Sequence, residues 1–398
     1  MKGTQCAPFP RHHHHHHRGG GISSSATLIR RPKWIIILVF FISISVIGAY
    51  IFPPRQYVYS PCYFFSSPLC NPFGDWKNSP TERDLTDDEL NSDAVIKEIL
   101  STPPVESDNN KIAFMFLTPD TLPFEKLWEK FFYGHEDKYS VYVHSSDHKS
   151  GHASPIFANA DIRSSKVEWG KISMVDAERR LLANAFQNTD NQHFVLLSES
   201  CIPLYNFDRI YRYLMETNVS FVDCFHDPGP HGTGRYSERM KPEVKKKDFR
   251  KGSQWFSLKR QHALIILADT LYYTKFKKYC QPSMSGNKNC YADEHYLPTV
   301  FNLIDPGGIA NRSITYVDWS EGKWHPKTFM ERDISKRLVK NLTSINKCVH
   351  VTSDEKRVEE QMHCLWNGVQ SPCYLFARKF YPQTQHKLMN LLSNLAII

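Results

Sequence analysis

The sequence lacks the short motifs that mark several common catalytic sites. It has no Asp-x-Asp and no Cys-x-x-Cys pair, so the usual close spacings of carboxylate or thiolate metal ligands are missing. It has no Gly-x-Gly-x-x-Gly after its first predicted strand and no Walker loop, which argues against dinucleotide or P-loop phosphate binding. Without a Gly-x-Ser-x-Gly elbow, an α/β hydrolase is also excluded.

Excess charge of one sign is scarce outside the N-terminus. The 398 residues carry a formal net charge of +8, of which +6 lies in residues 1–33, so the remainder is close to neutral. Broad nucleic-acid binding needs a basic face and is therefore not expected. With 41% hydrophobic residues, the chain can fill the core of one large or two ordinary domains.

One long hydrophobic run stands near the N-terminus. Residues 34–52, WIIILVFFISISVIGAYIF, carry no charge and match the helix length that crosses a bilayer core of about 30 Å. Basic residues precede the run and almost none follow closely, so residues 1–33 are expected in the cytosol. A cleaved signal peptide is the alternative, but Pro53-Pro54 stands where a small-residue cleavage site would be needed. The pattern predicts a type II membrane protein with a signal anchor.

The chain beyond the anchor has the features of a protein in a secretory lumen. N-glycosylation sequons begin at Asn218, Asn311 and Asn341. Nine of the ten cysteines follow the anchor, where disulfides form. Close spacing suggests three pairs, although spacing alone does not determine connectivity: Cys62–Cys70, Cys280–Cys290 and Cys364–Cys373.

Proline marks the next division of the chain. Eight prolines lie in residues 53–110, where one short helix is predicted at 86–100. We interpret this segment as a luminal stem that holds a catalytic domain, residues 111–398, away from the membrane.

Predicted strands and helices alternate after the stem. Strands are expected at 111–118, 139–146, 194–200 and 220–225, and helices at 123–134, 173–186 and 207–216. Ser173 and Asp176 have capping-box spacing at the start of one helix. The alternation predicts an α/β fold with a mainly parallel sheet and helices on both faces. Ligands bind such sheets beyond the carboxyl ends of the strands, which here are polar and rich in acids.

Four sequence blocks in order carry a more specific signal: LLSES (196–200), GSQWFSLKR (252–260), DEHYLPT (293–299) and SPCYLFARKF (371–380). Together they resemble the core-2/I-branching β-1,6-N-acetylglucosaminyltransferase family, most closely its plant branch, over residues 111–382. The resemblance implies a GT-A-like nucleotide-sugar-binding sheet, an anchor in the Golgi membrane, and inverting transfer from a UDP-sugar. It also implies catalysis without a metal cofactor.

The DEHYLPT block supplies the candidate base. Inverting transfer requires a carboxylate that takes the proton of the attacking hydroxyl, and the resemblance assigns that role to Glu294. Asp293 is expected either to cap the following helix or to help bind the acceptor. Alternatively, both acids simply favour a helix N-terminus.

The ARKF sequence supplies candidate cations for the departing diphosphate. Lys379 lies where the resembling family places a diphosphate-binding lysine, and Arg378 is its neighbour. The alternative is a solvated basic turn. Other substrate contacts are expected from Trp255, a sugar-stacking ring or plain core, from Glu238, near the family's acceptor-binding glutamate, and from Trp324 on the donor side.

The sequence thus predicts a Golgi glycosyltransferase that transfers a sugar from a UDP-sugar to a glycan or glycoprotein. GlcNAc is the sugar expected first. One alternative is a UDP-glucuronic acid-dependent transferase acting on arabinogalactan-type glycans. Others are a non-catalytic glycan-binding protein and a receptor or tether for protein partners.

Overall fold

The structure is a computed structural model and describes residues 95, 107, 109–146, 151–283, 289–323 and 325–398. The predicted cytosolic tail, the anchor at 34–52 and nearly all of the stem lie outside these residues, as does the Cys62–Cys70 pair. None of the helices within the described ranges is long and apolar enough to span a bilayer.

The elements follow the predicted alternation at first and then become shorter and more irregular. In chain order they are β1 (Lys111–Thr118), α3 (Glu125–Phe132), β2 (Tyr139–Ser145), α4 (Ser173–Phe186), β3 (Asn191–Ser198), β4 (Ile202–Pro203), α5 (Phe207–Met215), the 3₁₀ turns η3 (Thr233–Arg235), η4 (Glu238–Met240) and η5 (Lys246–Asp248), β5 (Ser257–Lys259), α6 (Arg260–Ala268), α7 (Leu271–Tyr279), η6 (Ala292–Glu294), α8 (Tyr296–Ile304), η7 (Pro306–Gly308), β6 (Thr315–Val317), η8 (Glu331–Asp333), α9 (Lys336–Ser344), β7 (Lys347–Val351), β8 (Glu359–His363), β9 (Leu365–Trp366), β10 (Val369–Gln370), β11 (Phe376–Arg378), η9 (Pro382–Thr384) and α10 (Gln385–Asn394).

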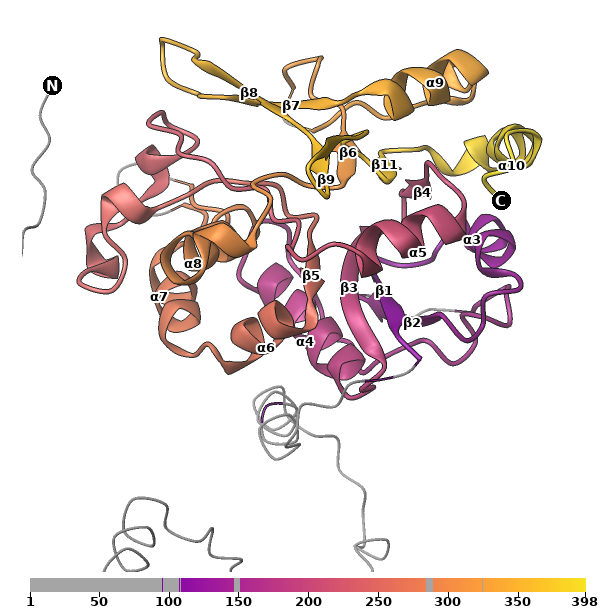
Figure 1. Cartoon of the computed structure of the whole chain (residues 1–398). Coiled ribbons are helices and arrows are strands. Elements are labelled where there is room, and N and C mark those ends of the chain that lie inside the picture. The colour runs from indigo at the N-terminus through magenta and orange to yellow at the C-terminus, as the bar shows by residue number, and fades with distance from the viewer. Residues whose placement is uncertain (1–94, 96–106, 108, 147–150, 284–288, 324) are drawn as a thin grey trace, which may run out of the picture. The chain divides into compact units, whose positions relative to one another are not determined.

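The main sheet has the strand order β2-β1-β3-β5. The first three strands are parallel, and β5 joins β3 in the antiparallel sense. Figure 1 shows α4 and α6 on one side of this sheet and α3 and α5 on the other. The predicted α/β fold, with a mainly parallel sheet between helices, is confirmed.

Alternation along β1 explains why helices cover both faces. Ala113, Met115 and Leu117 pack with the residues of α4 and α6 in one core. Phe114 and Phe116 point the opposite way, into a second core that contains Trp128 of α3. Because successive side chains of a strand alternate between faces, a strand that is apolar throughout needs a layer on each side.

Two local predictions are wrong. The segment 220–225 is not a strand: Phe221 bridges Ser257 and Phe225 bridges Lys251, and the residues between them are irregular. Asp223 lies in that interval, and its carboxylate accepts a hydrogen bond from the Ser253 amide at 2.9 Å. The capping box at α4 is also absent, because Ile172 is the N-cap and makes no side-chain cap.

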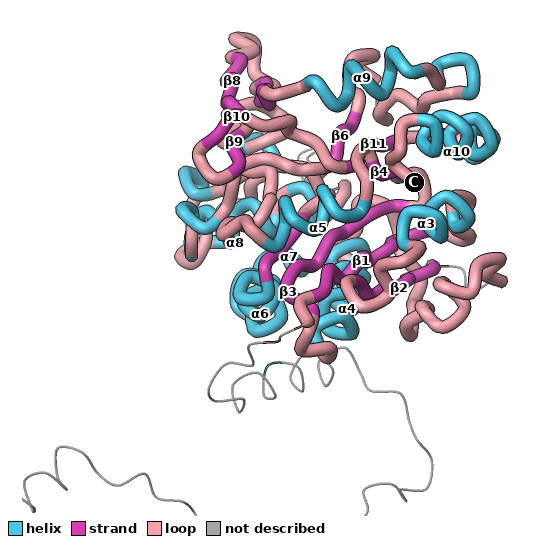
Figure 2. Tube along the Cα trace, turned by 45° about the vertical axis from the view of Figure 1, so that its right-hand side comes forward, coloured by secondary structure: helices cyan, strands magenta, loops and turns pink. Residues whose placement is uncertain are grey.

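A second, smaller sheet extends the domain beyond β3. Its order is β4-β11-β6, and Figure 2 shows it in the C-terminal part of the fold, near α9 and α10. The hairpin formed by β7 and β8 is a separate two-stranded sheet. The predicted disulfides Cys280–Cys290 and Cys364–Cys373 are both formed, and Cys201, Cys224 and Cys348 are free and buried.

Candidate active site

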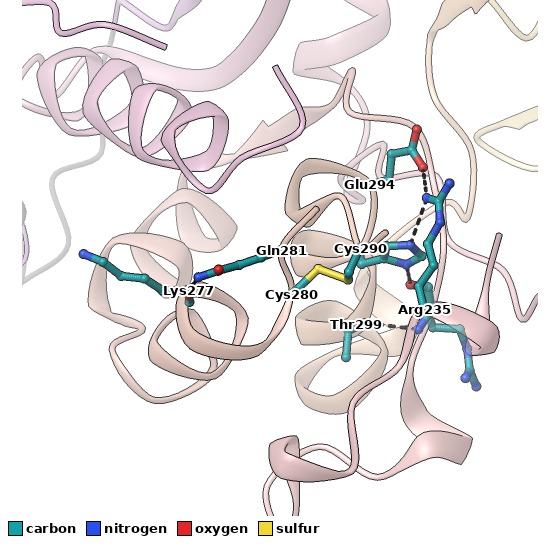
Figure 3. The surroundings of a disulfide bond; sticks show 9 residues. Arg235, Lys277, Cys280, Gln281, Cys290, Glu294 and Thr299 are labelled. Carbon is teal, nitrogen blue, oxygen red and sulfur yellow. Dashed lines mark hydrogen bonds and ion pairs between the residues drawn. A yellow bond between two sulfur atoms is a disulfide. The ribbon is translucent and has the colours of Figure 1, made fainter. Parts of the chain in front are cut away.

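Glu294 ends the short turn η6, immediately before α8. Its side chain is 30% exposed, and its Oε2 accepts a hydrogen bond from Arg235 Nη1 at 2.6 Å. Figure 3 shows this pair beside the Cys280–Cys290 disulfide. The second oxygen, Oε1, has no hydrogen-bond partner in the described part of the chain. One oxygen is therefore held while the other remains able to accept a proton.

The acids of this block do not cap the helix that follows them. The N-cap of α8 is His295, and no side chain caps that end of the helix. The ring of His295 instead hydrogen-bonds the Arg250 carbonyl oxygen at 2.7 Å. The expectation that Asp293 caps α8 is therefore wrong, since its carboxylate is directed elsewhere.

Asp293 is half-buried, and its Oδ1 is wholly withdrawn from solvent with no hydrogen-bond partner. Burial, reinforced by the charge of Glu294, raises the pKa of Asp293 to about 7. Behind it, Glu178 of α4 is buried and accepts a hydrogen bond from Gln254 at 2.9 Å. Burial, together with the charge of Asp293, raises the pKa of Glu178 well above its usual value. Asp293 therefore stays neutral under mildly acidic conditions in which an exposed aspartate is ionised.

Arg235 is the cation nearest the candidate base. It is buried, and its guanidinium lies 4.6 Å from the centre of the Tyr291 ring. Its Nη2 lies 3.3 Å from Nδ1 of His231. Ring stacking and the ion pair together restrict the guanidinium to one position.

Lys251 is a second cation near Glu294. Its Nζ lies 3.9 Å from Oδ2 of the buried Asp227. Burial lowers the pKa of Lys251, and the nearby negative charge of Glu294 opposes that effect. The basic segment 239–251 therefore ends in a partly buried lysine close to the candidate base.

Residues 252–255 connect the acidic side of the site to a cationic side. The Gly252 amide donates a hydrogen bond to the Glu294 carbonyl oxygen at 2.9 Å. Three residues later, Trp255 is buried, and the Arg378 guanidinium lies 4.2 Å from the centre of its ring. Because three residues span at most about 11 Å, one short segment contacts both the Glu294 backbone and the Arg378 guanidinium.

The two predicted cations have different environments. Arg378 belongs to β11 and stacks on Trp255, and its Nε is buried without a partner. Burial lowers the pKa of Arg378 from its usual value. Lys379 is half-buried, and within the described residues its amine has neither an ion-pair nor a hydrogen-bond partner. The Phe380 amide bonds the Ser200 carbonyl oxygen at 3.1 Å, which places Lys379 at the carboxyl end of β3.

The remaining predicted substrate contacts differ in their environments. Glu238 is 66% exposed and pairs with Lys241 at 2.7 Å. Trp324 lies outside the described residues. Trp255 is core on most of its surface, as the alternative interpretation expected, but it also supports Arg378.

No three His, Cys, Asp or Glu side chains are grouped to hold a metal ion in the described ranges. A separate pocket is lined by residues that include His226, Arg250 and His350. It contains none of the predicted site residues.

Sequence reasoning missed Arg235, Tyr291 and Lys251. Tyr291 is two residues before the DEHYLPT block, so its proximity to Glu294 could be inferred from the sequence. Arg235 is 59 positions away from its partner, and GTGRY (232–236) carries no motif that links it to a carboxylate.

Comparison with known proteins identifies the fold family. The sequence profile of the core-2/I-branching enzyme family matches residues 112–343, which is more than half of the chain. The chain belongs to the core-2/I-branching enzyme family. This membership confirms the resemblance drawn from the four sequence blocks.

A rice protein is also similar to this chain over most of its length. The chain is 35% identical over 331 residues to the Oryza sativa subsp. japonica protein named glycosyltransferase BC10, covering 75% of this chain and 80% of the rice protein. Family and relative together indicate that this core-2/I-branching enzyme is a glycosyltransferase.

Proposed function

We propose that this glycosyltransferase moves a sugar from a UDP-sugar to a glycan or glycoprotein acceptor with inversion at the anomeric carbon. The observation that carries the proposal is the environment of Glu294: Arg235 holds one of its oxygens at 2.6 Å, and the other oxygen has no hydrogen-bond partner among the described residues. UDP-GlcNAc is the expected donor. Metal independence and a type II position in the Golgi membrane belong to the same proposal.

In the proposed step, the acceptor oxygen bonds to the anomeric carbon as its proton passes to Glu294 Oε1. The bond from the anomeric carbon to the diphosphate oxygen breaks, and its electron pair leaves with UDP. Lys379 is the side chain proposed to neutralise the charge that develops on the diphosphate, because its amine is uncommitted and lies at the carboxyl end of β3. Asp293, neutral under mildly acidic conditions, lies beside the base and is proposed to contact the acceptor. Glu238, exposed beside Lys241, is also proposed as an acceptor contact.

The test is a transfer and hydrolysis assay on the full-length protein with a panel of UDP-sugars, in the presence of EDTA. We expect turnover with UDP-GlcNAc in EDTA, and its loss in Glu294→Gln. Glu216→Gln is the matched control, because Glu216 is an exposed residue at the end of α5. Activity that requires a divalent cation, or that persists in Glu294→Gln, would contradict the proposed mechanism.

The alternatives have distinct outcomes in the same assay. Turnover of UDP-glucuronic acid alone would favour the arabinogalactan-directed transferase. Saturation-transfer NMR that detects glycan binding, with no turnover of any donor, would favour a non-catalytic glycan-binding protein.

A further inference from the structure

The loop that carries Arg235 is attached to the β7–β8 hairpin by one buried carboxylate. Asp227 is 1% exposed and accepts three hydrogen bonds, from the Ser353 amide at 2.9 Å, the Ser353 hydroxyl at 2.7 Å and the Gly229 amide at 2.9 Å. The Ser353 hydroxyl also accepts a bond from the His231 amide at 2.9 Å. A buried carboxylate with several donors is a strong anchor, because removing any donor leaves charge unsatisfied.

Two glycines mark close backbone contacts of the loop, Gly229 with the hairpin and Gly232 with the loop itself. A Cβ added to Gly229 would lie 2.3 Å from the Asp354 amide nitrogen. One added to Gly232 would lie 2.1 Å from the Asp227 carbonyl oxygen. Neither neighbour is the end of a flexible side chain, so a larger residue must displace the loop.

The loop passes this constraint directly to Arg235. The Thr233 amide bonds the Asp227 carbonyl oxygen at 2.7 Å, and the Arg235 amide bonds that of Gly232 at 2.9 Å. The guanidinium then reaches Glu294 across the Tyr291 ring, as Figure 3 shows for the Arg235–Glu294 pair. The anchoring carboxylate of Asp227 and Arg235 are only eight positions apart in the sequence.

The hairpin itself is fixed at its own base. The Cys364–Cys373 disulfide follows β8 directly, and His350 of β7 bonds Asp223 at 2.7 Å. The hairpin, residues 347–363, also lies beyond the region that the family profile matches, which ends at residue 343. It therefore contacts, from outside that region, a loop that lies inside it.

We infer that Arg235 is a positioning residue for Glu294, and that the turn of the β7–β8 hairpin, through Ser353 and Asp227, determines where its guanidinium lies. The inference rests on the proposed function of Glu294 as the base. Arg235 does not transfer a proton; it holds Oε2 so that Oε1 faces the acceptor. Misplacement of a reacting group by about 1 Å is enough to reduce turnover about 100-fold.

The first test measures hydrolysis of UDP-GlcNAc and UDP-glucuronic acid by the full-length protein. Arg235→Met should lower kcat about 100-fold with little change in donor KM, and Arg235→Lys should restore part of it. The acid limb of the pH profile should move to higher pH in Arg235→Met, because a fixed positive charge beside the carboxylate is gone. Ser353→Ala should lower kcat by a smaller factor, roughly 3- to 10-fold.

The second test needs no turnover. Hydrogen–deuterium exchange of the peptide spanning 289–296 should become faster in Arg235→Met, Ser353→Ala and Gly229→Ala. It should not change in Arg332→Met or Ser393→Ala, which alter exposed side chains far from the loop in sequence. If Arg235→Met does not fold, Ser353→Ala and Arg235→Lys, which are milder changes, provide the same comparison.

The outcomes separate this inference from the proposed function. If Glu294→Gln remains active, the base assignment fails and this inference fails with it. If Glu294→Gln is inactive but Arg235→Met and Ser353→Ala match their controls in kcat, pH profile and exchange, only the positioning role is overturned.

Discussion

The guanidinium of Arg378 lies over the ring of Trp255, with 4.2 Å between its central carbon and the ring centre. This stack occupies one end of residues 252–255, and the other end bonds Glu294 through Gly252. The two adjacent cations therefore have different tasks. Arg378 is held in the core, whereas the amine of Lys379 has no ion-pair or hydrogen-bond partner among the described residues.

Exchanging each cation for methionine should separate these tasks. Lys379→Met should lower kcat/KM for the donor about 100-fold with an unchanged melting temperature, because one charge-neutralising group is lost. Arg378→Met should leave the melting temperature equal or higher, because an apolar chain replaces a buried guanidinium whose Nε has no partner. Donor kinetics and thermal unfolding measure both effects, with Lys340→Met as the exposed control. A reversed pattern would show that Arg378 binds the diphosphate.

Stability should depend on pH through Asp293. Its pKa is raised to about 7 in the folded protein, above its ordinary value, so the folded state binds an extra proton between about pH 4 and pH 7. The free energy of unfolding should therefore fall as pH rises through this window, by about 3 kcal/mol between pH 5 and pH 8. In Asp293→Asn this part of the decrease should disappear. Denaturant unfolding of both proteins at the two pH values measures it, and parallel curves would contradict it.

The two disulfides should contribute similarly to stability and differently to turnover. They close loops of nearly equal length, with sequence separations of 10 and 9, so losing either should cost about 3 kcal/mol. Cys290 precedes Glu294 by four residues, and its amide bonds the Gln281 carbonyl oxygen at 3.1 Å. We therefore expect the Cys280→Ser/Cys290→Ser protein to lose more kcat than the Cys364→Ser/Cys373→Ser protein. Equal losses of kcat would indicate a purely global effect.

Glycosylation tests the predicted luminal position. Asn341 is exposed on α9 and Asn218 is exposed after α5, whereas Asn311 is half-buried beside buried Arg312 and Ser313. We expect Asn341→Gln to remove one glycan from protein made in a secretory host, seen as a mass shift sensitive to peptide-N-glycosidase. Asn394→Gln, an exposed asparagine outside any sequon, should leave the mass of the glycans unchanged. A protein without glycans at either exposed sequon would contradict the luminal prediction.

Local sequence pattern predicted the strands and helices of the first half of the domain, but it failed where the backbone partners are distant in the chain. Strand β1 and helix α4 were predicted to the residue, because uninterrupted apolar character and helical spacing are properties of neighbouring positions. The predicted strand at 220–225 is also mostly apolar, yet only Phe225 and Phe221 near its ends bridge residues 251 and 257. Its middle is irregular because the Asp223 carboxylate bonds the Ser253 amide in a distant segment. A local window of sequence around Asp223 does not contain that partner.

The chain by itself was enough to predict the alternating α/β elements, to suggest the two described disulfide pairs and to indicate Glu294 as the candidate base. Those features depend on short spacings, on cysteines close in the chain, and on blocks that share an order with a known family. Only the tertiary structure decided that Arg235 holds Glu294 and that Trp255 covers Arg378. It also decided that the β7–β8 hairpin contacts the loop that carries Arg235. The reason is physical: an ion pair or a stack between residues 59 or 123 positions apart exists only after the sheet and its helices have packed, and no local propensity encodes it.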